Sequence, residues 1–315
     1  MTYKIFDAHS DIPDYVYFQR IKGRTKVLET EFDNFFGEFV KVRVAAVWTR
    51  PEKRNMALQY ALEMINQLYK DVGESTKFAI VKNTKEMENA LKNNKIALWI
   101  GMEGGEPLQE SLDLLEVFHT LGLRVLTLTW NLRNAIGDGC TERTNGGLTN
   151  FGIEVVGKAE ELGILVDLSH INEQGFWDVL DMTKTPLIAS HSNARALCDH
   201  VRNLRDEQIK AIAERDGVIG VTAYPPFIHK TKPTLKGMID HIKYMVDLVG
   251  YKHVGLGFDF TEYLAGWEGA NVLENFKNEQ DIPQLVKILT ENFTEKEVKA
   301  ITFENFRRVF KKVVG

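Results

Sequence analysis

Two side chains suited to metal binding and acid–base chemistry lie close together near the start of the chain. His9 and Asp11 stand two residues apart in FDAHSDIP, directly after a short apolar run, and Asp7 and Asp14 flank them. In an extended segment, residues at i and i+2 point to the same side, so this imidazole and this carboxylate could hold one cation together. Both groups are ligands for Zn²⁺ and comparable divalent ions.

Four more candidate residues also follow apolar runs. Glu103 lies in ALWIGMEGG, His170 ends ILVDLSH, His191 ends PLIASH and Asp259 ends VGLGFD. A single histidine at such a place is more often hydrogen-bonded or solvent-facing than a ligand, and Asp259 alone could be a helix N-cap. The joint pattern favours a functional site, because three of the eight histidines fall at the ends of apolar runs and chance would scatter them.

The apolar runs alternate with longer amphipathic segments, which is the pattern of parallel strands joined by helices. We expect strands at 4–6, 42–48, 78–81, 96–100, 124–128, 164–168, 186–189, 218–221 and 253–257. Helical patterns lie at 55–69, 84–91, 108–121, 151–162, 172–180, 205–215 and 235–248. A capping-box sequence at 294–297 begins the last helix.

This alternation predicts an α/β fold, a (β/α)8 TIM barrel of the metal-dependent hydrolase type, as a single catalytic domain over residues 1–315. Nine candidates are one too many for eight strands, and we expect the short run 78–81 to lie outside the barrel. The carboxyl ends of barrel strands open on one face, so the three histidines and three carboxylates would share one mouth. No glycine-rich phosphate-binding motif follows a strand, which disfavours nucleotide binding.

Composition disfavours several other classes of protein. The formal net charge of −5 leaves no surplus of basic residues for phosphates, so we expect no nucleic-acid partner. We find no signal-like start and no apolar stretch near the ~20 residues that span a bilayer, so we expect no membrane association and a cytoplasmic location. Cys140 and Cys198 are the two cysteines and they form no CxxC pair, which predicts reduced thiols and no closed structural zinc site.

The candidate ligands together predict a centre that holds two divalent metal ions, with Zn²⁺ favoured. His9 and Asp11 would hold one ion, and His170 and His191, from neighbouring strands, would hold the other. Glu103 is flanked by glycines that let the backbone approach closely, so its two oxygens could bridge the ions. Ions bridged in this way lie about 3.5–4 Å apart and share a water molecule whose pKa falls towards neutrality.

Several motifs, in this order, resemble the membrane dipeptidase (renal dipeptidase) family of zinc metallopeptidases, known as M19: DAHSDIP, GMEGG, LTLTWN, GLTNFG, LVDLSH, ASHSNARAL, VRN, VGLGFDF and ENFRRVF. The resemblance implies a (β/α)8 barrel with a binuclear zinc centre that hydrolyses dipeptides, including those with a C-terminal D-residue. Carried onto matching positions, it makes Asp259 the proton shuttle and Arg202 the residue that binds the substrate carboxylate. It is also compatible with a homodimer.

The implied mechanism has a metal-bridging hydroxide that attacks the scissile carbonyl, while Asp259 moves the proton to the leaving amine. The chain departs from the family pattern where well-known members carry a histidine that contacts the substrate oxygen. Trp130 stands there, and its indole can donate a hydrogen bond but cannot exchange a proton. We expect Trp130 to contact the substrate and to alter its range. Glu106 and Thr261 are further departures.

Two alternatives stay open. Another binuclear-metal hydrolase could act on a lactone, a phosphoester or a cyclic amide, because two metals and a shuttle acid do not identify the bond that is cleaved. A non-catalytic barrel could retain metal or peptide binding without turnover, with Trp130 as the sign of lost activity. The presence of Asp259 argues against the second alternative, since a binding protein needs no proton shuttle.

The segment 260–279 is long for a connection between a strand and a helix, and it carries Tyr263 and Trp267 among glycines. Long loops at this face of a barrel commonly form lids or substrate walls. An ordinary surface excursion is the alternative.

Overall fold

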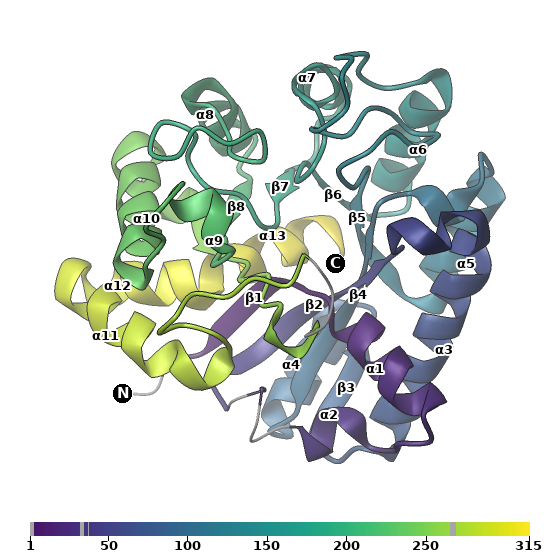
Figure 1. Cartoon of the computed structure of the whole chain (residues 1–315), viewed down its shortest axis with the longest axis horizontal. Helices are drawn as coiled ribbons and strands as arrows, with labels where there is room; N and C mark the ends of the chain where they lie inside the picture. Colours follow the sequence, from purple (N-terminus) through teal and green to yellow (C-terminus); the bar gives the residue numbers. More distant parts are fainter. Residues whose placement is uncertain (1–2, 32–34, 37, 265–268) are drawn as a thin grey trace.

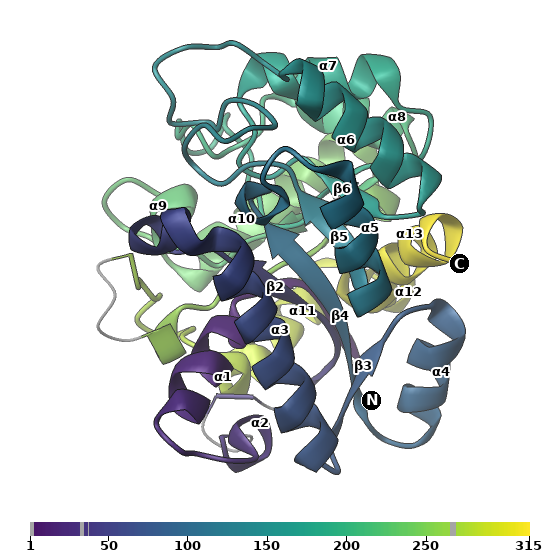
Figure 2. The ribbon, with the colours of Figure 1, turned by 90° about the vertical axis from the view of Figure 1, so that its right-hand side faces the viewer.

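Nine parallel strands form the central sheet of the protein, and eight of them close into a barrel (Figures 1 and 2). The computed structural model describes residues 3–31, 35–36, 38–264 and 269–315. The strands are β1 (Ile5–Ser10), β2 (Val40–Trp48), β3 (Phe78–Val81), β4 (Ile96–Glu103), β5 (Leu123–Thr127), β6 (Leu165–Asp167), β7 (Ile188–Ala189), β8 (Val218–Val221) and β9 (Val254–Leu256).

The barrel closes where β2 pairs with β4, from Val42 opposite Ala97 to Trp48 opposite Glu103. The ring then runs β1, β2, β4, β5, β6, β7, β8, β9 and back to β1. β3 pairs only with the first half of β4, whereas β5 pairs with β4 from Ile100 onward. The predicted (β/α)8 barrel is therefore confirmed, and so is the expectation that residues 78–81 lie outside it.

Helices surround the strands (Figure 1). They are α1 (Ile12–Ile21), α2 (Val27–Thr30), α3 (Ala57–Glu74), α4 (Thr84–Lys92), α5 (Leu112–Leu121), α6 (Asn150–Glu161), α7 (Glu173–Met182), α8 (Asp206–Glu214), α9 (Pro225–Ile228), α10 (Leu235–Val249), α11 (Ile282–Asn292), α12 (Glu295–Lys299) and α13 (Asn305–Val313). The seven predicted helical patterns correspond to α3 to α8 and α10, and Thr294 forms the predicted capping box of α12. In the part of the chain that the structure describes, no helix is both long and apolar enough to cross a bilayer.

The sequence analysis missed α1 and α11, and also the short helices α2 and α9. α1 carries Tyr15, Val16, Tyr17 and Phe18 in a row, and such residues favour strands. Tertiary contacts with α3 stabilise it as a helix, because Tyr17 donates a hydrogen bond to Glu63 and Arg20 pairs with Asp71 on that helix.

The interior of the barrel is filled by alternate strand residues. The C-terminal segment closes the end of the barrel at which the strands begin. Phe6 of β1 and Trp99 of β4 belong to this cluster, together with Phe303, Phe306 and Phe310 from the segment that ends in α13. A separate and larger apolar cluster lies between the strands and the surrounding helices. We call these five aromatic side chains the aromatic plug. In Figure 2, α13 lies to the right of the strands, whereas α9, which follows the carboxyl end of β8, lies to the left. The aromatic plug is therefore opposite the mouth. The mouth is thereby left free for polar side chains.

Close backbone packing between β8, β9 and the end of β7 helps to shape the mouth. A Cβ atom on Gly257 would lie 1.8 Å from the Ser190 carbonyl oxygen, and one on Gly220 would lie 2.0 Å from the same oxygen. Both positions therefore require glycine, since real Cβ atoms do not approach an oxygen this closely. Ser190, just before His191, is thereby packed closely against β8 and against the residue that follows β9.

The aromatic plug predicts a stability effect. Phe310 is fully buried, with its ring centroid 5.0 Å from those of Phe6 and Trp99. Phe310→Ala should lower the free energy of unfolding by about 3–5 kcal/mol, because it leaves a cavity among rigid rings. Chemical denaturation measures this loss. Lys311→Ala, at an exposed position of the same helix, is the control and should change stability by less than about 0.5 kcal/mol.

Candidate metal centre and active site

The predicted site residues come together at the carboxyl ends of the barrel strands. His9 lies in β1 and Glu103 is the last residue of β4, while Asp11, Trp130, His170, His191 and Asp259 follow β1, β5, β6, β7 and β9 within a few residues, and Arg202 lies in the longer loop after β7. Strands far apart in the sequence thus supply one cluster, as expected at this face of a barrel.

One carboxylate oxygen of Glu103 lies at the centre of the three imidazoles. Its Oε1 is 2.8 Å from His170 Nε2, 3.4 Å from His191 Nε2 and 3.6 Å from His9 Nε2. The Nε2 atoms of His170 and His191 are 2.8 Å apart. The same oxygen, Oε1, approaches one histidine of the first predicted ligand pair and both histidines of the second, so the bridging role of Glu103 through its two oxygens stays a prediction.

On the other side of His9, two more carboxylates approach the same imidazole nitrogen. Asp11 Oδ1 lies 3.6 Å and Asp259 Oδ1 4.0 Å from His9 Nε2. Two overlapping groups could therefore each hold a cation: His9, Glu103 and His191 form one, and His9, Asp11 and Asp259 form the other. The grouping differs from the predicted one, because the imidazole of His9 is common to both.

The predicted extended geometry of His9 and Asp11 is wrong. β1 ends at Ser10, and Asp11 is the N-cap residue of α1 with φ −80° and ψ 26°. The two side chains still converge, but they do so because the chain turns from strand into helix between them. Pro13 in the first helical turn favours this turn, since proline fixes a helical φ and needs no hydrogen-bond acceptor there.

The cluster is chemically suited to hold metal ions. His9 Nε2 and Asp11 Oδ1 are buried and have no hydrogen-bond partner among the described residues. Unpaired buried polar atoms are costly, and a cation placed between them would remove that cost. Imidazole nitrogens and carboxylate oxygens without a thiolate suit zinc and related divalent ions. The residues therefore fit the metal that their types predict.

Burial and mutual charge shift the pKa values across the cluster. Burial raises the pKa of Glu103 well above its usual range, and burial with the nearby Asp11 raises that of Asp259 to about 7. Burial by itself would lower the pKa of His9, but Glu103, Asp11 and Asp259 together raise it to about 10. In the metal-free protein, a proton on His9 thus supplies the positive charge that the carboxylates require.

His170 and His191 have the opposite electrostatic behaviour. Burial lowers the pKa of both imidazoles well below the usual value, and the positive charges of Arg202 and His9 lower it further. Both rings are therefore neutral near pH 7. A neutral imidazole is the form that binds a metal ion.

The orientation of His191 is fixed by a chain of hydrogen bonds. Ser190 Oγ donates to Asp167 Oδ2 at 2.6 Å and lies 2.8 Å from His191 Nδ1. Asp167 also accepts the backbone N–H groups of Ser169 and Ser190, so its carboxylate is held in place. Since the hydroxyl hydrogen of Ser190 goes to Asp167, Nδ1 of His191 carries the proton and Nε2 is free for a cation.

Asn131 has the same role beside His170. Its Oδ1 lies 2.9 Å from His170 Nδ1, so the ring donates there and keeps Nε2 towards Glu103. His170 and Asp259 also adopt left-handed backbone conformations, with φ of 70° and 55°. Such strain in residues other than glycine is typical of functional sites. The sequence analysis did not identify Asn131, Ser190 and Asp167 as residues that orient the histidines, although Asn131 and Ser190 adjoin predicted site residues.

Arg202 and Trp130 lie at the edge of the cluster. Arg202 is 3% exposed and donates from Nη2 to the His191 carbonyl at 3.1 Å, while its Nε has no partner among the described residues. The Trp130 ring centroid lies 6.2 Å from that of His170 and 5.4 Å from that of Trp48. The structure thus places both residues where a substrate at the cluster could touch them.

The segment after β9 forms part of the wall of the site. Tyr263 is buried, its hydroxyl lies 3.1 Å from Ser10 Oγ, and the charge of Asp11 contributes, after burial, to a raised tyrosine pKa. Tyr224 Oη donates to the Gly269 carbonyl across the loop. The described parts of the segment therefore favour a wall over a simple surface excursion. Trp267 lies outside the described residues.

Fold and site together define a class of protein. A parallel eight-stranded barrel that gathers imidazoles and carboxylates at the carboxyl ends of its strands is an architecture of metal-dependent hydrolases. A family model for the membrane dipeptidases, peptidase family M19, matches residues 1–314. The chain belongs to this family, which confirms the resemblance seen in its motifs.

Individual relatives agree with this assignment. An uncharacterised dipeptidase of Schizosaccharomyces pombe is 32% identical, over 98% of this chain and 80% of the relative. The solved structure of a metallopeptidase named dipeptidase AC matches with a TM-score of 0.88 at 24% identity, over 100% of both chains. A metallopeptidase from Rhodobacter sphaeroides, bound to a phosphinate mimic of L-Ala-D-Ala, also gives 0.88, at 23% identity, over 99% of this chain and 100% of that one. The solved structures confirm the barrel fold.

The hydrogen-bond chain behind His191 predicts an effect on metal affinity. Ser190→Ala removes the group that orients the imidazole, so zinc affinity should fall about 10- to 100-fold. Competition with a chromophoric chelator measures this affinity independently of catalysis. Ser111→Ala, whose side chain caps no helix, is the matched control and should bind zinc like the unaltered protein. Unchanged affinity in Ser190→Ala would contradict a positioning role.

The raised pKa of His9 predicts that metal binding depends on pH. Below about pH 10 the free protein holds a proton on His9, and a metal ion at Nε2 must displace it. Zinc affinity should therefore rise with pH between 6 and 8, by about tenfold per pH unit for each proton displaced. Calorimetric titration in buffers of different ionisation enthalpy counts the released protons. Binding without proton release would show that His9 is not a ligand or is not protonated.

Proposed function

We propose that this protein is a binuclear zinc dipeptidase that hydrolyses dipeptides, including those with a C-terminal D-residue. The observation that carries the proposal is the Glu103 carboxylate within reach of His9, His170 and His191, in a chain of the membrane dipeptidase family. The phosphinate mimic of L-Ala-D-Ala bound by the Rhodobacter sphaeroides relative supports a dipeptide as the substrate.

His9 and Asp11 would hold one ion, His170 and His191 the other, and Glu103 would lie between the two. When bound, the ions supply Lewis acidity, which polarises the scissile carbonyl, and they lower the pKa of a water molecule. The zinc assignment rests on the mixture of imidazoles and carboxylates.

Asp259 is the residue best suited to move the proton. Its pKa of about 7 allows the carboxyl to accept and return a proton near neutral pH, and its Oδ1 lies 4.0 Å from His9 Nε2 at the edge of the cluster. It would take the proton from the attacking water and give it to the nitrogen of the leaving amine. The side chain is 15% exposed, which leaves it open to the substrate side.

Arg202 would bind and orient the free carboxylate of the substrate. Its Nε is buried without a partner among the described residues, and a carboxylate there would accept a charge-assisted hydrogen bond. This contact would hold the single peptide bond of a dipeptide at the cluster, and it would favour substrates with a free C-terminus. Trp130, beside His170, would cover the substrate from the other side and could donate from its indole nitrogen.

Replacement of the proposed proton shuttle tests the function. The zinc-loaded protein should hydrolyse dipeptides such as Ala-Ala with an L- or D-residue at the second position, and chelation should abolish this activity. Asp259→Asn should keep its zinc and lower kcat about 10²- to 10⁴-fold, because the amide cannot accept the proton. Metal analysis and steady-state kinetics measure the two quantities.

Other outcomes of this assay identify the alternatives. Turnover of a lactone, a phosphoester or a cyclic amide, with no dipeptide hydrolysed, would make the protein a different metal-dependent hydrolase. Zinc binding without turnover of any of these compounds would make it a non-catalytic barrel. An unchanged kcat in Asp259→Asn would contradict the shuttle assignment.

A further inference from the structure

Asp7 is a buried acid of the first motif that the proposed mechanism does not use. It lies in β1, two residues before His9, and it is 1% exposed. Its Oδ1 accepts hydrogen bonds from the backbone N–H of His9 at 3.3 Å and from that of Phe258 at 2.9 Å. One carboxyl oxygen therefore joins the end of β1 to the chain that follows β9.

The two hydrogen bonds connect segments that carry site residues. His9 belongs to both candidate cation groups, and Phe258 directly precedes Asp259, the proposed proton shuttle. The backbone N–H of Asp259 also donates to the His9 carbonyl at 3.4 Å, which links the same two segments again. The left-handed backbone of Asp259, with φ of 55°, persists only where neighbouring contacts determine it. The hydrogen bond from Phe258 to Asp7 is such a contact.

Asp167 makes the same pair of contacts between β6 and β7. Its Oδ1 accepts the N–H of Ser169, two residues further along the chain, at 3.0 Å and that of Ser190 at 2.8 Å. Ser190 directly precedes His191, as Phe258 precedes the proposed shuttle. Two pairs of adjacent strands thus use a buried aspartate in the same way, just before a site residue. This repetition favours a common role, which is to fix the residue that follows.

The surroundings of Asp7 are held by further buried contacts. Arg43 of β2 lies opposite Asp7 in the register of the two strands, and it is fully buried. Its Nη2 donates to Glu279 at 2.9 Å, and its guanidinium lies 5.2 Å from the centroid of the Phe36 ring. Glu279 is the last residue of the segment 260–279, which forms part of the wall of the site. The chain just before this segment and the end of the segment are therefore anchored beside neighbouring residues of β1 and β2.

We propose that Asp7 is a positioning residue that fixes Asp259 through the backbone N–H of Phe258. The inference rests on the proposed dipeptidase function, in which Asp259 moves the proton. Without the carboxyl of Asp7, the Phe258 N–H would be buried without its acceptor, and the turn at Asp259 would shift to satisfy it. A shift of about 1 Å in a group that takes part in the reaction can lower the rate about 10²-fold.

A double-mutant cycle with the proposed shuttle tests this role. In the zinc-loaded protein, Asp7→Ala should lower kcat for Ala-Ala about 10- to 100-fold, with a smaller change in KM. In the Asp259→Asn background, the same change should lower kcat by less than about threefold, because the group that Asp7 positions is already gone. Asp7→Asn keeps an oxygen that can accept both N–H groups, so it should retain most of the activity. Metal analysis confirms the zinc content of every variant.

Asp71→Ala is the matched control. Asp71 is also a fully buried aspartate that accepts two backbone N–H groups, from Val27 and Leu28, but it lies in α3, which supplies no site residue. The control should leave kcat as it is. Where Asp7→Ala does not fold, Asp7→Glu replaces it, because the longer side chain keeps the carboxyl group but moves it away from the two N–H groups. Its effect on kcat should depend on Asp259 in the same way.

The cycle separates positioning from a general structural role. Equal losses of kcat in the two backgrounds, an unchanged kcat in Asp7→Ala, or an Asp7→Asn variant as impaired as Asp7→Ala would overturn the inference while dipeptidase activity stands. Loss of zinc from Asp7→Ala would also overturn it, because Asp7 would then act on the metal ligand His9. Failure of the unaltered protein to hydrolyse any dipeptide would overturn both the inference and the proposed function.

Discussion

The dominant physical constraint on this protein is the burial of several carboxyl groups beside three imidazoles at one end of the barrel. Glu103 is 4% exposed and Asp11 is 6% exposed, and carboxylates withdrawn from water cost several kcal/mol each unless a positive charge compensates them. The proton on His9 can compensate only part of this charge. The site therefore fits cations, and the strands around it hold these charged groups in a fixed relation.

The barrel meets this constraint with hydrogen bonds that fix the orientation of two of the histidines. Asp167 and Ser190 orient His191, and Asn131 orients His170, so that both rings present the same nitrogen to Glu103. Left-handed backbone at His170 and Asp259 is costly, and it persists only where the surrounding structure determines it. Rigid side chains that need no rearrangement to receive a metal ion are the expected result of such support.

The surroundings of the centre differ on its two sides. Towards Arg202 and Asn172 they are polar, with buried hydrogen-bonding atoms that lack partners among the described residues. Towards Trp48 and Trp130 they are aromatic, with ring centroids 5.4 Å apart. An asymmetry of this kind is suited to a small substrate whose two ends differ in polarity.

The sequence predicted the barrel, the strand excluded from it and the site residues that meet at its mouth, because each rests on local order. Parallel strands are apolar in continuous runs, and a residue that follows such a run must lie at the carboxyl end of a barrel. The family motifs added Arg202, whose position in a long loop follows no local rule. α1 was missed because Tyr15 to Phe18 favour a strand, and only contacts with α3 make that segment helical.

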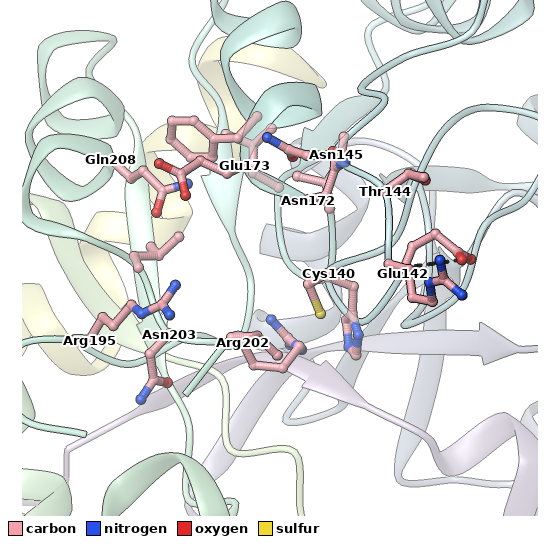
Figure 3. Close-up of a pocket in the computed structure, with 17 residues that line it drawn as sticks. Cys140, Glu142, Thr144, Asn145, Asn172, Glu173, Arg195, Arg202, Asn203 and Gln208 are labelled. Atoms are coloured by element: carbon pink, nitrogen blue, oxygen red, sulfur yellow. Dashed lines mark hydrogen bonds between the residues drawn. The ribbon is translucent and has the colours of Figure 1, made fainter. Parts of the chain in front are cut away.

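The tertiary structure alone decided how the site residues are grouped and held. The common place of His9 in both candidate cation groups depends on distances between separate strands, and so does the link from Asp167 through Ser190 to His191. A pocket of about 220 Å³ beside His170 and Arg202 likewise forms between the separate loops that follow β5, β6 and β7 (Figure 3). Sequence periodicity specifies which face of an element is apolar, whereas hydrogen bonds and cavities depend on sub-ångström packing between elements, which no local pattern encodes.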